Sequence, residues 1–209
     1  MTIREVNEQW KSNQNDGMNS QPRKEISVKK SIAEKLSFTA LFAALCCVGT
    51  LVIVIPLPYG YFNAGDIFVL LAGWCLGPVF GSVAAAIGSS LADVLSGFLL
   101  YAPVTFVVKG VDALIAYFVW FAVKKFLFKG SADIAARIVS AVVAESWMVL
   151  GYFAFESILY GIAGGAASLA GNALQGGFAV VCGTVLIACL YKITPVRGFF
   201  PCLGRVKHL

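Results

Sequence analysis

Long apolar runs and short polar or turn-forming segments alternate along this chain. After a polar stretch at 1–31, the runs end at turn residues such as Pro56, Pro58 and the Gly77-Pro78 pair. They lie at 33–55, 65–77, 79–97, 103–123, 134–157 and 168–190. Because about 20 apolar residues carry a helix across a bilayer, the pattern predicts an all-α integral membrane protein, a bundle of six transmembrane helices. The second run is short, so we expect it to tilt, break or pack inside the bundle.

Composition supports this class and sets the domain boundaries. Of 209 residues, 59% are hydrophobic and 13% are charged, which leaves little chain for a soluble catalytic or nucleotide-binding domain. Residues 1–31 mix both signs of charge with Asn, Gln and Ser, and are predicted to form a cytoplasmic mobile tail. The transmembrane domain is expected at 32–192 and a cytoplasmic C-terminal tail at 193–209. The first apolar run is long enough to span, so we predict an uncleaved helix and not a signal peptide.

The placement of Lys and Arg predicts the orientation of the bundle. All 16 except Lys109 lie before or at the start of the first run, around the turn between the fourth and fifth runs, or after the sixth. The loops at 56–64, 98–103 and 158–167 carry none. Under the positive-inside rule both termini are cytoplasmic and the uncharged loops face outward. The basic residues are not interleaved with stacking aromatic residues, so no nucleic-acid partner is expected.

Lys109 is the one cation predicted to lie within the outer part of a span. A buried ammonium group in lipid is costly unless it is paired or hydrated, so it should have a partner. Asp112 lies three residues further on the same helical face, and Asp93 in the third run is another candidate. A structural ion pair and a direct ligand role are both open for Lys109, and both place it inside the bundle.

Other polar residues are predicted to gather in the outward half of the bundle. They come from the second, fifth and sixth runs: Asp66, Glu145, Tyr152, Glu156, Asn172 and Gln175. Glu145 lies deepest and has no cation near it in sequence, so it is protonated, paired across helices or bound to a ligand. Asp66 and Glu156 lie at helix ends and can equally be interfacial. Convergence of such groups from several helices predicts a ligand pocket reached from outside.

A second pattern leads from the end of the second run through the third, with a small residue at every fourth position. These residues are Gly77, Gly81, Ala85 and Ser89, and the row leads to Asp93. Small residues let another backbone approach closely, and we expect this face to pack within the bundle and not between copies of the chain.

Residue patterns of common enzymes are absent from the sequence. His208 is the only histidine and lies in the C-terminal tail, which excludes a Ser-His dyad, a HExxH zinc site and a haem-type His pair. The glycine-rich stretch at 161–167 has no Lys-Ser/Thr after it and is therefore no P-loop. We expect no catalytic residue, no metal and no cofactor, and any ATP must be used by another subunit.

Four short motifs point to a known family. They are Asn63-Ala-Gly-Asp66, Leu76-Gly-Pro-Val-Phe-Gly81, Gly88-Ser-Ser-Leu-Ala-Asp93 and Tyr101-Ala-Pro-Val-Thr-Phe-Val-Val-Lys-Gly110. The chain, from about 37 to 191, resembles the substrate-specific S components of energy-coupling factor (ECF) vitamin transporters, in the branch with riboflavin-, hydroxymethylpyrimidine- and pyridoxine-type members. The resemblance implies a protein of the bacterial plasma membrane that captures a small B vitamin or vitamin precursor from outside. It also implies delivery to the cytoplasm when the chain is docked on a T component with two ABC ATPases.

The resemblance assigns roles to particular residues. It implies T-component docking through Ala40 and Ala44 on the first helix. The implied substrate-binding residues are Asn63, Asp66, Tyr101, Lys109, Glu145, Tyr152, Asn172 and Gln175. Asp93, Lys109 and Asp112 are the expected structural ion pair. Two other functions stay open on the sequence: a stand-alone proton-coupled secondary transporter and, with less support, an integral-membrane enzyme.

Overall fold

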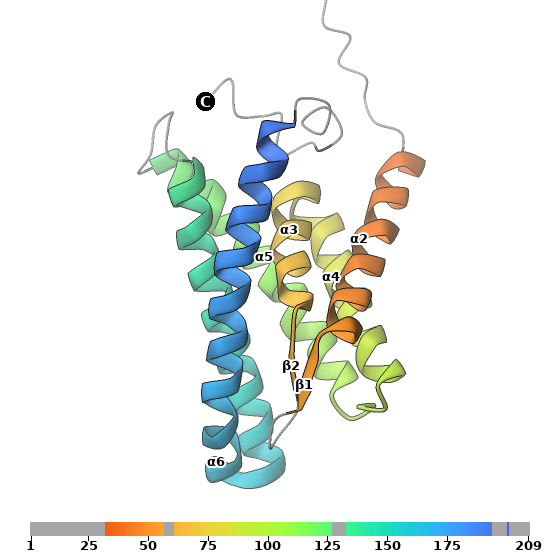
Figure 1. Ribbon diagram of the computed structural model, residues 1–209, viewed down its shortest axis with the longest axis vertical. Helices are drawn as coiled ribbons and strands as arrows, with labels where there is room; N and C mark the ends of the chain where they lie inside the picture. Colours follow the sequence, from red (N-terminus) through yellow and green to blue (C-terminus); the bar gives the residue numbers. More distant parts are fainter. Residues whose placement is uncertain (1–31, 57–60, 127–132, 194–199, 201–209) are drawn as a thin grey trace, which may run out of the picture. The chain divides into compact units, whose positions relative to one another are not determined.

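The computed structural model describes residues 32–56, 61–126, 133–193 and 200, which form five helices and a pair of strands. The elements are α2 (Ile32–Val52), β1 (Val54–Pro56), β2 (Tyr61–Asn63), α3 (Gly65–Leu76), α4 (Pro78–Leu95), α5 (Ala102–Phe126) and α6 (Asp133–Lys192), coloured along the chain in Figure 1. The predicted tail at 1–31 and nearly all of the one at 193–209 lie outside the described residues.

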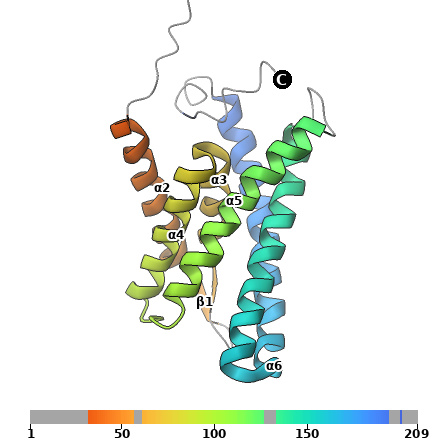
Figure 2. The same cartoon turned by 180° about the vertical axis from the view of Figure 1, so that it is seen from behind.

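The helices of residues 32–193 place their connections at two opposite ends of the bundle. One end holds the start of α2, the end of α5 and both ends of α6, and we call it the basic end (Figures 1 and 2). The other holds the β1–β2 pair, the turn between α4 and α5 and a reversal within α6, and we call it the hairpin end. Lys35, Lys124 and Lys192 belong to the basic end, as the distribution of charge predicts.

Helix α6 departs from the predicted helix ends. Two helices separated by a loop at 158–167 are expected, whereas helical structure runs through this segment and is interrupted only at Gly161. There φ is 79° and ψ is 167°, a conformation available to glycine and strained for other residues. The chain reverses at this point, and the two arms lie side by side in both views (Figures 1 and 2). The uncharged outer loop of the prediction is thus replaced by a one-residue turn between two long arms.

By length and composition, four helices of the described residues can cross a membrane: α2, α4, α5 and α6. Helix α3 has only 12 residues and is shorter than a full span. It begins partway along the bundle, where β2 ends, and runs to the basic end (Figure 1). The short second run is therefore an inner half-helix.

Strands β1 and β2 correct the all-α prediction. They pair antiparallel, with Ile55 opposite Phe62 in the middle of the register. The segment is rich in β-branched and aromatic residues, which favour strands. The prediction assigned most of it to a loop at 56–64. Strand β2 carries the chain from the hairpin end into the interior, and this places Asn63 and Asp66 deep in the fold, both buried.

Small residues pack inward and large apolar residues face outward. Gly81 on α4 lies against the backbone of Ala72, and Gly88 lies against the backbone of Ala43. The opposite face of α4 exposes Val79, Val83, Ile87 and Leu91. Close backbone contacts inside and an apolar exterior are typical of helices in lipid. The small-residue row of α4 thus packs within the bundle, as predicted.

The basic end contains a buried charged cluster, which we call the basic-end cluster. It consists of Lys124, Asp133, Arg137, Trp74 and Trp120. The Asp133 carboxylate accepts from Lys124 Nζ at 2.8 Å, from Arg137 Nε at 2.7 Å and from Trp120 Nε1 at 3.0 Å. The Arg137 guanidinium, fully buried, lies 4.5 Å from the Trp120 ring centre and 5.5 Å from that of Trp74. These contacts join α3, α5 and the start of α6.

Candidate functional site

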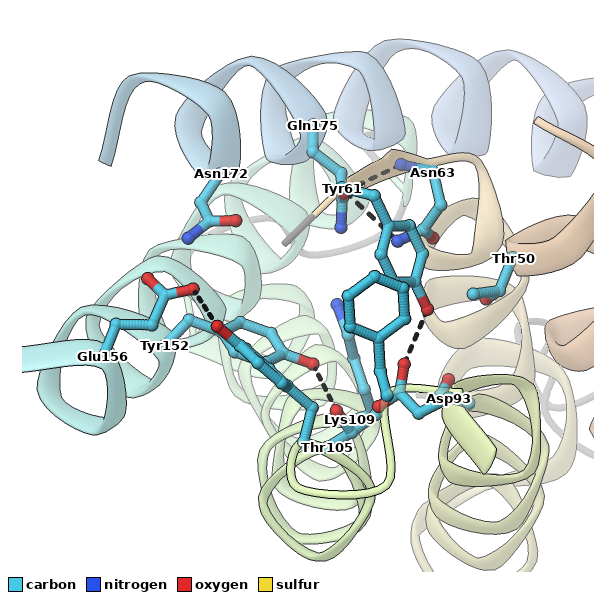
Figure 3. A pocket seen from close by; sticks show the side chains of 13 residues that line it. Thr50, Tyr61, Asn63, Asp93, Thr105, Lys109, Tyr152, Glu156, Asn172 and Gln175 are labelled. Carbon is cyan, nitrogen blue, oxygen red and sulfur yellow. Dashed lines mark hydrogen bonds between the residues drawn. The ribbon is translucent and has the colours of Figure 1, made fainter. Parts of the chain in front are cut away.

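A pocket lies toward the hairpin end, between β2, α4, α5 and the two arms of α6 (Figure 3). Its volume is about 490 Å³, including the space at its open mouth. The lining residues are Thr50, Tyr61, Asn63, Ser89, Asp93, Phe98, Tyr101, Thr105, Lys109, Tyr152, Glu156, Asn172 and Gln175. A pocket with aromatic walls and a few convergent polar groups is typical of a small-molecule site.

A hydrogen-bonded chain of four side chains forms the floor of the pocket, and we call it the pocket network. Lys109 on α5 forms a buried ion pair with Asp66 on α3. The second Asp66 oxygen accepts from Gln175 Nε2 at 2.6 Å. Gln175 Oε1 in turn accepts from the backbone N–H of Asn63 at 2.9 Å and from its Nδ2 at 3.2 Å. The network links β2, α3, α5 and α6, and it balances the Lys109 charge inside the protein.

Two tyrosines of the lining are held by hydrogen bonds. Tyr61 donates to Asp93 Oδ1 at 2.6 Å, which joins β2 to α4. The hydroxyl groups of Tyr152 and Thr105 lie 2.9 Å apart and join α6 to α5. Figure 3 shows these pairs on the pocket wall.

Aromatic rings and Glu156 line the pocket on the side of the hairpin end. The Phe98 ring centre lies 4.9 Å from that of Tyr61 and 6.1 Å from that of Tyr101. The Tyr101 hydroxyl lies 3.5 Å from Glu156 Oε1, and Ser168 donates to the other Glu156 oxygen. Both oxygens of this buried acid therefore have partners from the protein itself.

Six of the eight predicted substrate-binding residues meet in this pocket. They are Asn63, Tyr101, Lys109, Tyr152, Asn172 and Gln175. Asp66 lies behind the lining, where it holds Lys109 and Gln175. Glu145 lies elsewhere and is considered next.

Glu145 and Asp112 are buried acids away from the pocket lining. Glu145 lies at a separate, mainly apolar groove between the two arms of α6, and its Cβ packs against Gly176. Within the described residues, neither Glu145 nor Asp112 has a hydrogen-bond partner for its carboxylate oxygens. Glu145 thus lines a different groove from the other predicted substrate-binding residues, although it interacts electrostatically with Lys109 and Asp66.

The ion pair of Lys109 differs from the predicted one. Asp93 and Asp112 are the expected partners, whereas the structure pairs Lys109 with Asp66. The reason is the depth at which α3 begins, because its first turn brings Asp66 to the level of Lys109. Asp93 holds Tyr61 instead.

Several lining residues were not predicted as site residues. Tyr61 and Phe98 belong to segments that the sequence places in outer loops, and Ser89 belongs to the small-residue row of α4. Aromatic residues in loops that flank a predicted pocket would have been the signal for Tyr61 and Phe98. No sequence signal distinguishes Ser89 from its neighbours.

Apolar spanning helices around a polar, aromatic-walled pocket define a membrane protein that binds a small molecule. The family model of the ECF-type riboflavin transporter, S component, matches residues 30–192. A protein of Pyrococcus woesei, described as an uncharacterized protein in a gap 3′ region, is 33% identical over 138 residues, which cover 65% of this chain and 87% of that protein.

The chain therefore belongs to the family of ECF transporter S components. Members of this family are components of membrane vitamin transporters and not enzymes, and they work with a membrane T component and ATPases. The family agrees with the one that the four sequence motifs indicate.

Proposed function

We propose that this chain captures an unphosphorylated B vitamin or vitamin precursor with a planar heterocyclic ring and delivers it to the cytoplasm as part of an ECF-type importer. Riboflavin-, hydroxymethylpyrimidine- and pyridoxine-like molecules fit this description. The observation that carries the proposal is the polar pocket with its aromatic wall in a chain of this family. Stacking on Phe98 and the tyrosines, together with hydrogen bonds from the floor, suits such a ring.

The charges of the pocket favour an uncharged or cationic ligand. Lys109 is already neutralised by Asp66, and the remaining charged groups of the lining are the acids Asp93 and Glu156. A phosphorylated vitamin would bring two negative charges toward these acids without a free cation to compensate them. We therefore expect the unphosphorylated form to be the substrate.

The topology proposed for transport has six membrane crossings. They are α2, α3 together with the strands that lead into it, α4, α5 and the two arms of α6. The basic end faces the cytoplasm, and so do both termini, because Lys and Arg flank the helices there. The pocket then opens outward, in the bacterial plasma membrane, where it can collect its ligand before the ATPases act.

Docking on the T component is proposed to use the exposed side of α2. Ala40 and Ala44 are exposed and lie one turn apart, beside the exposed Leu36 and Leu41. Small residues on an exposed helical face let a partner helix approach its backbone closely. Conformational changes driven by ATP hydrolysis in the two partner ATPases would then be transmitted to the pocket through α2.

Binding of the substrate is tested on the purified full-length chain. Native mass spectrometry identifies the small molecule that co-purifies, and calorimetry with riboflavin, hydroxymethylpyrimidine and pyridoxine gives its affinity. We expect one of them to bind with a 1:1 stoichiometry and its phosphate ester to bind at least about tenfold more weakly. A chain that carries only lipid and binds none of the three would contradict the proposal.

Docking is tested by co-purification with the T component and the two ATPases. Ala40→Trp and Ala44→Trp should abolish association and leave ligand affinity unchanged. Val83→Trp, on the outward face of α4, is the matched control, since this position is already large, apolar and exposed. Intact association of both α2 variants would refute docking through this face.

A second candidate function is stand-alone proton-coupled transport. The buried carboxylates of Asp112 and Glu145 favour it, because acids without partners inside a membrane protein are typical of proton relays. Vesicles that contain the purified chain alone distinguish the two functions. Uptake driven by a proton gradient without ATPases would support the second, and binding without uptake supports the first.

A further inference from the structure

Three buried polar atoms of the pocket residues have no hydrogen-bond partner among the described residues. They are Ser89 Oγ, Asp93 Oδ2 and Asn172 Nδ2. Buried polar groups of folded proteins are nearly always paired, so each exception calls for an explanation. The other charged side chains of the lining, Lys109 and Glu156, are engaged with the protein itself.

The unpaired oxygens lie together on α4. Ser89 and Asp93 are four residues apart and so share one helical face, and both are more than nine-tenths buried. Tyr61 occupies Asp93 Oδ1 and leaves Oδ2 unpaired. The Thr105 hydroxyl also lies beside the Asp93 carboxylate, and its oxygen is 2.9 Å from the Tyr152 hydroxyl. This side of the pocket therefore presents a carboxylate acceptor and a hydroxyl group that can accept as well as donate.

The unpaired nitrogen lies across the pocket. Asn172 belongs to the second arm of α6, and Figure 3 shows it on the side opposite Asp93. Its Nδ2 group is a donor. A ligand in between would thus meet acceptors at one edge and a donor at the other.

We infer that Asp93 and Ser89 accept hydrogen bonds from an N–H or amino group of the substrate, and that Asn172 donates to an acceptor on its opposite edge. The inference rests on the proposed function and narrows it to planar heterocycles with a donor at one edge and a carbonyl or ring nitrogen at the other. It gives α4, whose small residues serve helix packing, a part in specificity. Lys109 then holds the floor of the pocket in position through Asp66. Asp93 is the acid that binds the ligand directly.

The ligand itself provides the first test. Calorimetry on the wild-type chain compares the tightest binder among riboflavin, hydroxymethylpyrimidine and pyridoxine with an analogue in which its donor is blocked. The analogues are N3-methylriboflavin, the pyrimidine with a 4-dimethylamino group in place of its amino group, and 3-O-methylpyridoxine. We expect the analogue to bind about ten- to one-hundredfold more weakly, the range for a hydrogen bond to a charged group. Equal affinity of parent and analogue would overturn the inference without any variant having to fold.

Substitutions then identify the acceptor. Asp93→Asn should lower the affinity for the parent ligand about tenfold or more. It should change the affinity for the analogue little, because the analogue has no donor for this acceptor. Ser89→Ala and Asn172→Asp should lower the affinity for the parent ligand by a smaller factor than Asp93→Asn does. Ser90→Ala is the matched control, since the Ser90 hydroxyl donates to the backbone oxygen of Ala86 and Ser90 does not line the pocket.

The outcomes separate this inference from the proposed function. Parent affinity that is unchanged in Asp93→Asn and Ser89→Ala, or lowered equally for parent and analogue, would refute the inference and leave vitamin binding intact. Failure of the wild-type chain to bind any of the three parents would refute the proposed function, and the inference with it.

Discussion

The pocket network and the basic-end cluster both bury an ion pair, but they are built differently. In the pocket network, Lys109 and Asp66 are 43 residues apart and come from two helices, and Asp66 has one cation. In the basic-end cluster, Asp133 receives two cations from within nine residues of the chain. The first pair closes a cavity, whereas the second is packed between tryptophan rings.

The difference separates a binding region from a stabilising one. At the basic end, rings cover the faces of Arg137, and Asp133 keeps a partner if one cation is lost. At the hairpin end, Asp66 has a single cation, and unpaired atoms such as Asp93 Oδ2 belong to residues that line the pocket. The unpaired Nη1 and Nη2 of Arg137 at the basic end belong instead to a guanidinium that lies against tryptophan rings. A region that binds a ligand leaves polar groups unpaired for it. Because Asp66 has one cation and Asp133 has two, removal of a cation should lower the free energy of unfolding more in the pocket network.

The largest expected effect is the loss of Lys109. Lys109→Met leaves the Asp66 carboxylate buried beside Gln175 without a cation, and we expect the free energy of unfolding to fall by about 3–5 kcal/mol. The measurement is SDS titration in mixed detergent micelles, followed by circular dichroism. Adding Asp66→Asn should restore a large part of the loss, because the buried charge is then gone. A double variant as unstable as the single one would argue against the ion pair.

Loss of Arg137 should lower the free energy of unfolding by less than loss of Lys109 does. Arg137→Met removes an ion pair and two cation–π contacts, worth about 2 kcal/mol where the cation is desolvated, while Lys124 still neutralises Asp133. Lys125→Met is the control, since Lys125 is exposed on α5 next to Lys124 and its loss should change the unfolding free energy little. If Arg137→Met proved as damaging as Lys109→Met in the same titration, the distinction between the two regions would be wrong.

The two regions also differ in how far the sequence predicts them. The apolar runs predict α2, α4 and α5 to within a few residues, and six of the eight candidate residues line the pocket. The partner of Lys109 was missed, because hydropathy does not show that α3 begins deep in the bundle and brings Asp66 to the lysine. The sequence predicts Arg137 to be one of the charges that mark the cytoplasmic side, whereas the structure buries it completely.

Contacts between distant segments explain both failures. Spacing within one helix makes the Asp133–Arg137 pair visible in the sequence, but burial of the arginine depends on Trp74 and Trp120 from two other helices. In the pocket, the atoms that matter most are those without partners, such as Asp93 Oδ2. Such unpaired atoms can be recognised only when the positions of all surrounding side chains are known.

The reversal of α6 at the hairpin end should tolerate change less than the neighbouring helix. Gly161→Ala places a side chain at φ 79° and should lower the free energy of unfolding by about 1–2 kcal/mol. Gly177→Ala in the second arm is the matched control, because its helical position has open space around it, and alanine favours helix by about 1 kcal/mol. Opposite signs are therefore expected in the same titration. Equal effects of the two substitutions would show that the turn does not require glycine.

The smallest effect should come from the hydroxyl pair on the pocket wall. Tyr152→Phe and Thr105→Val each remove one side of a 2.9 Å hydrogen bond and should cost about 1 kcal/mol of unfolding free energy. The double variant should cost little more than either single one, because the second substitution removes a group that has already lost its partner. Full additivity in this double-mutant cycle would show that the hydroxyl groups act independently. The hydroxyl pair should therefore contribute little to the free energy of unfolding, whereas Lys109 beside it should contribute much. This difference is expected if the pocket wall serves ligand binding and the Lys109–Asp66 ion pair holds it in place.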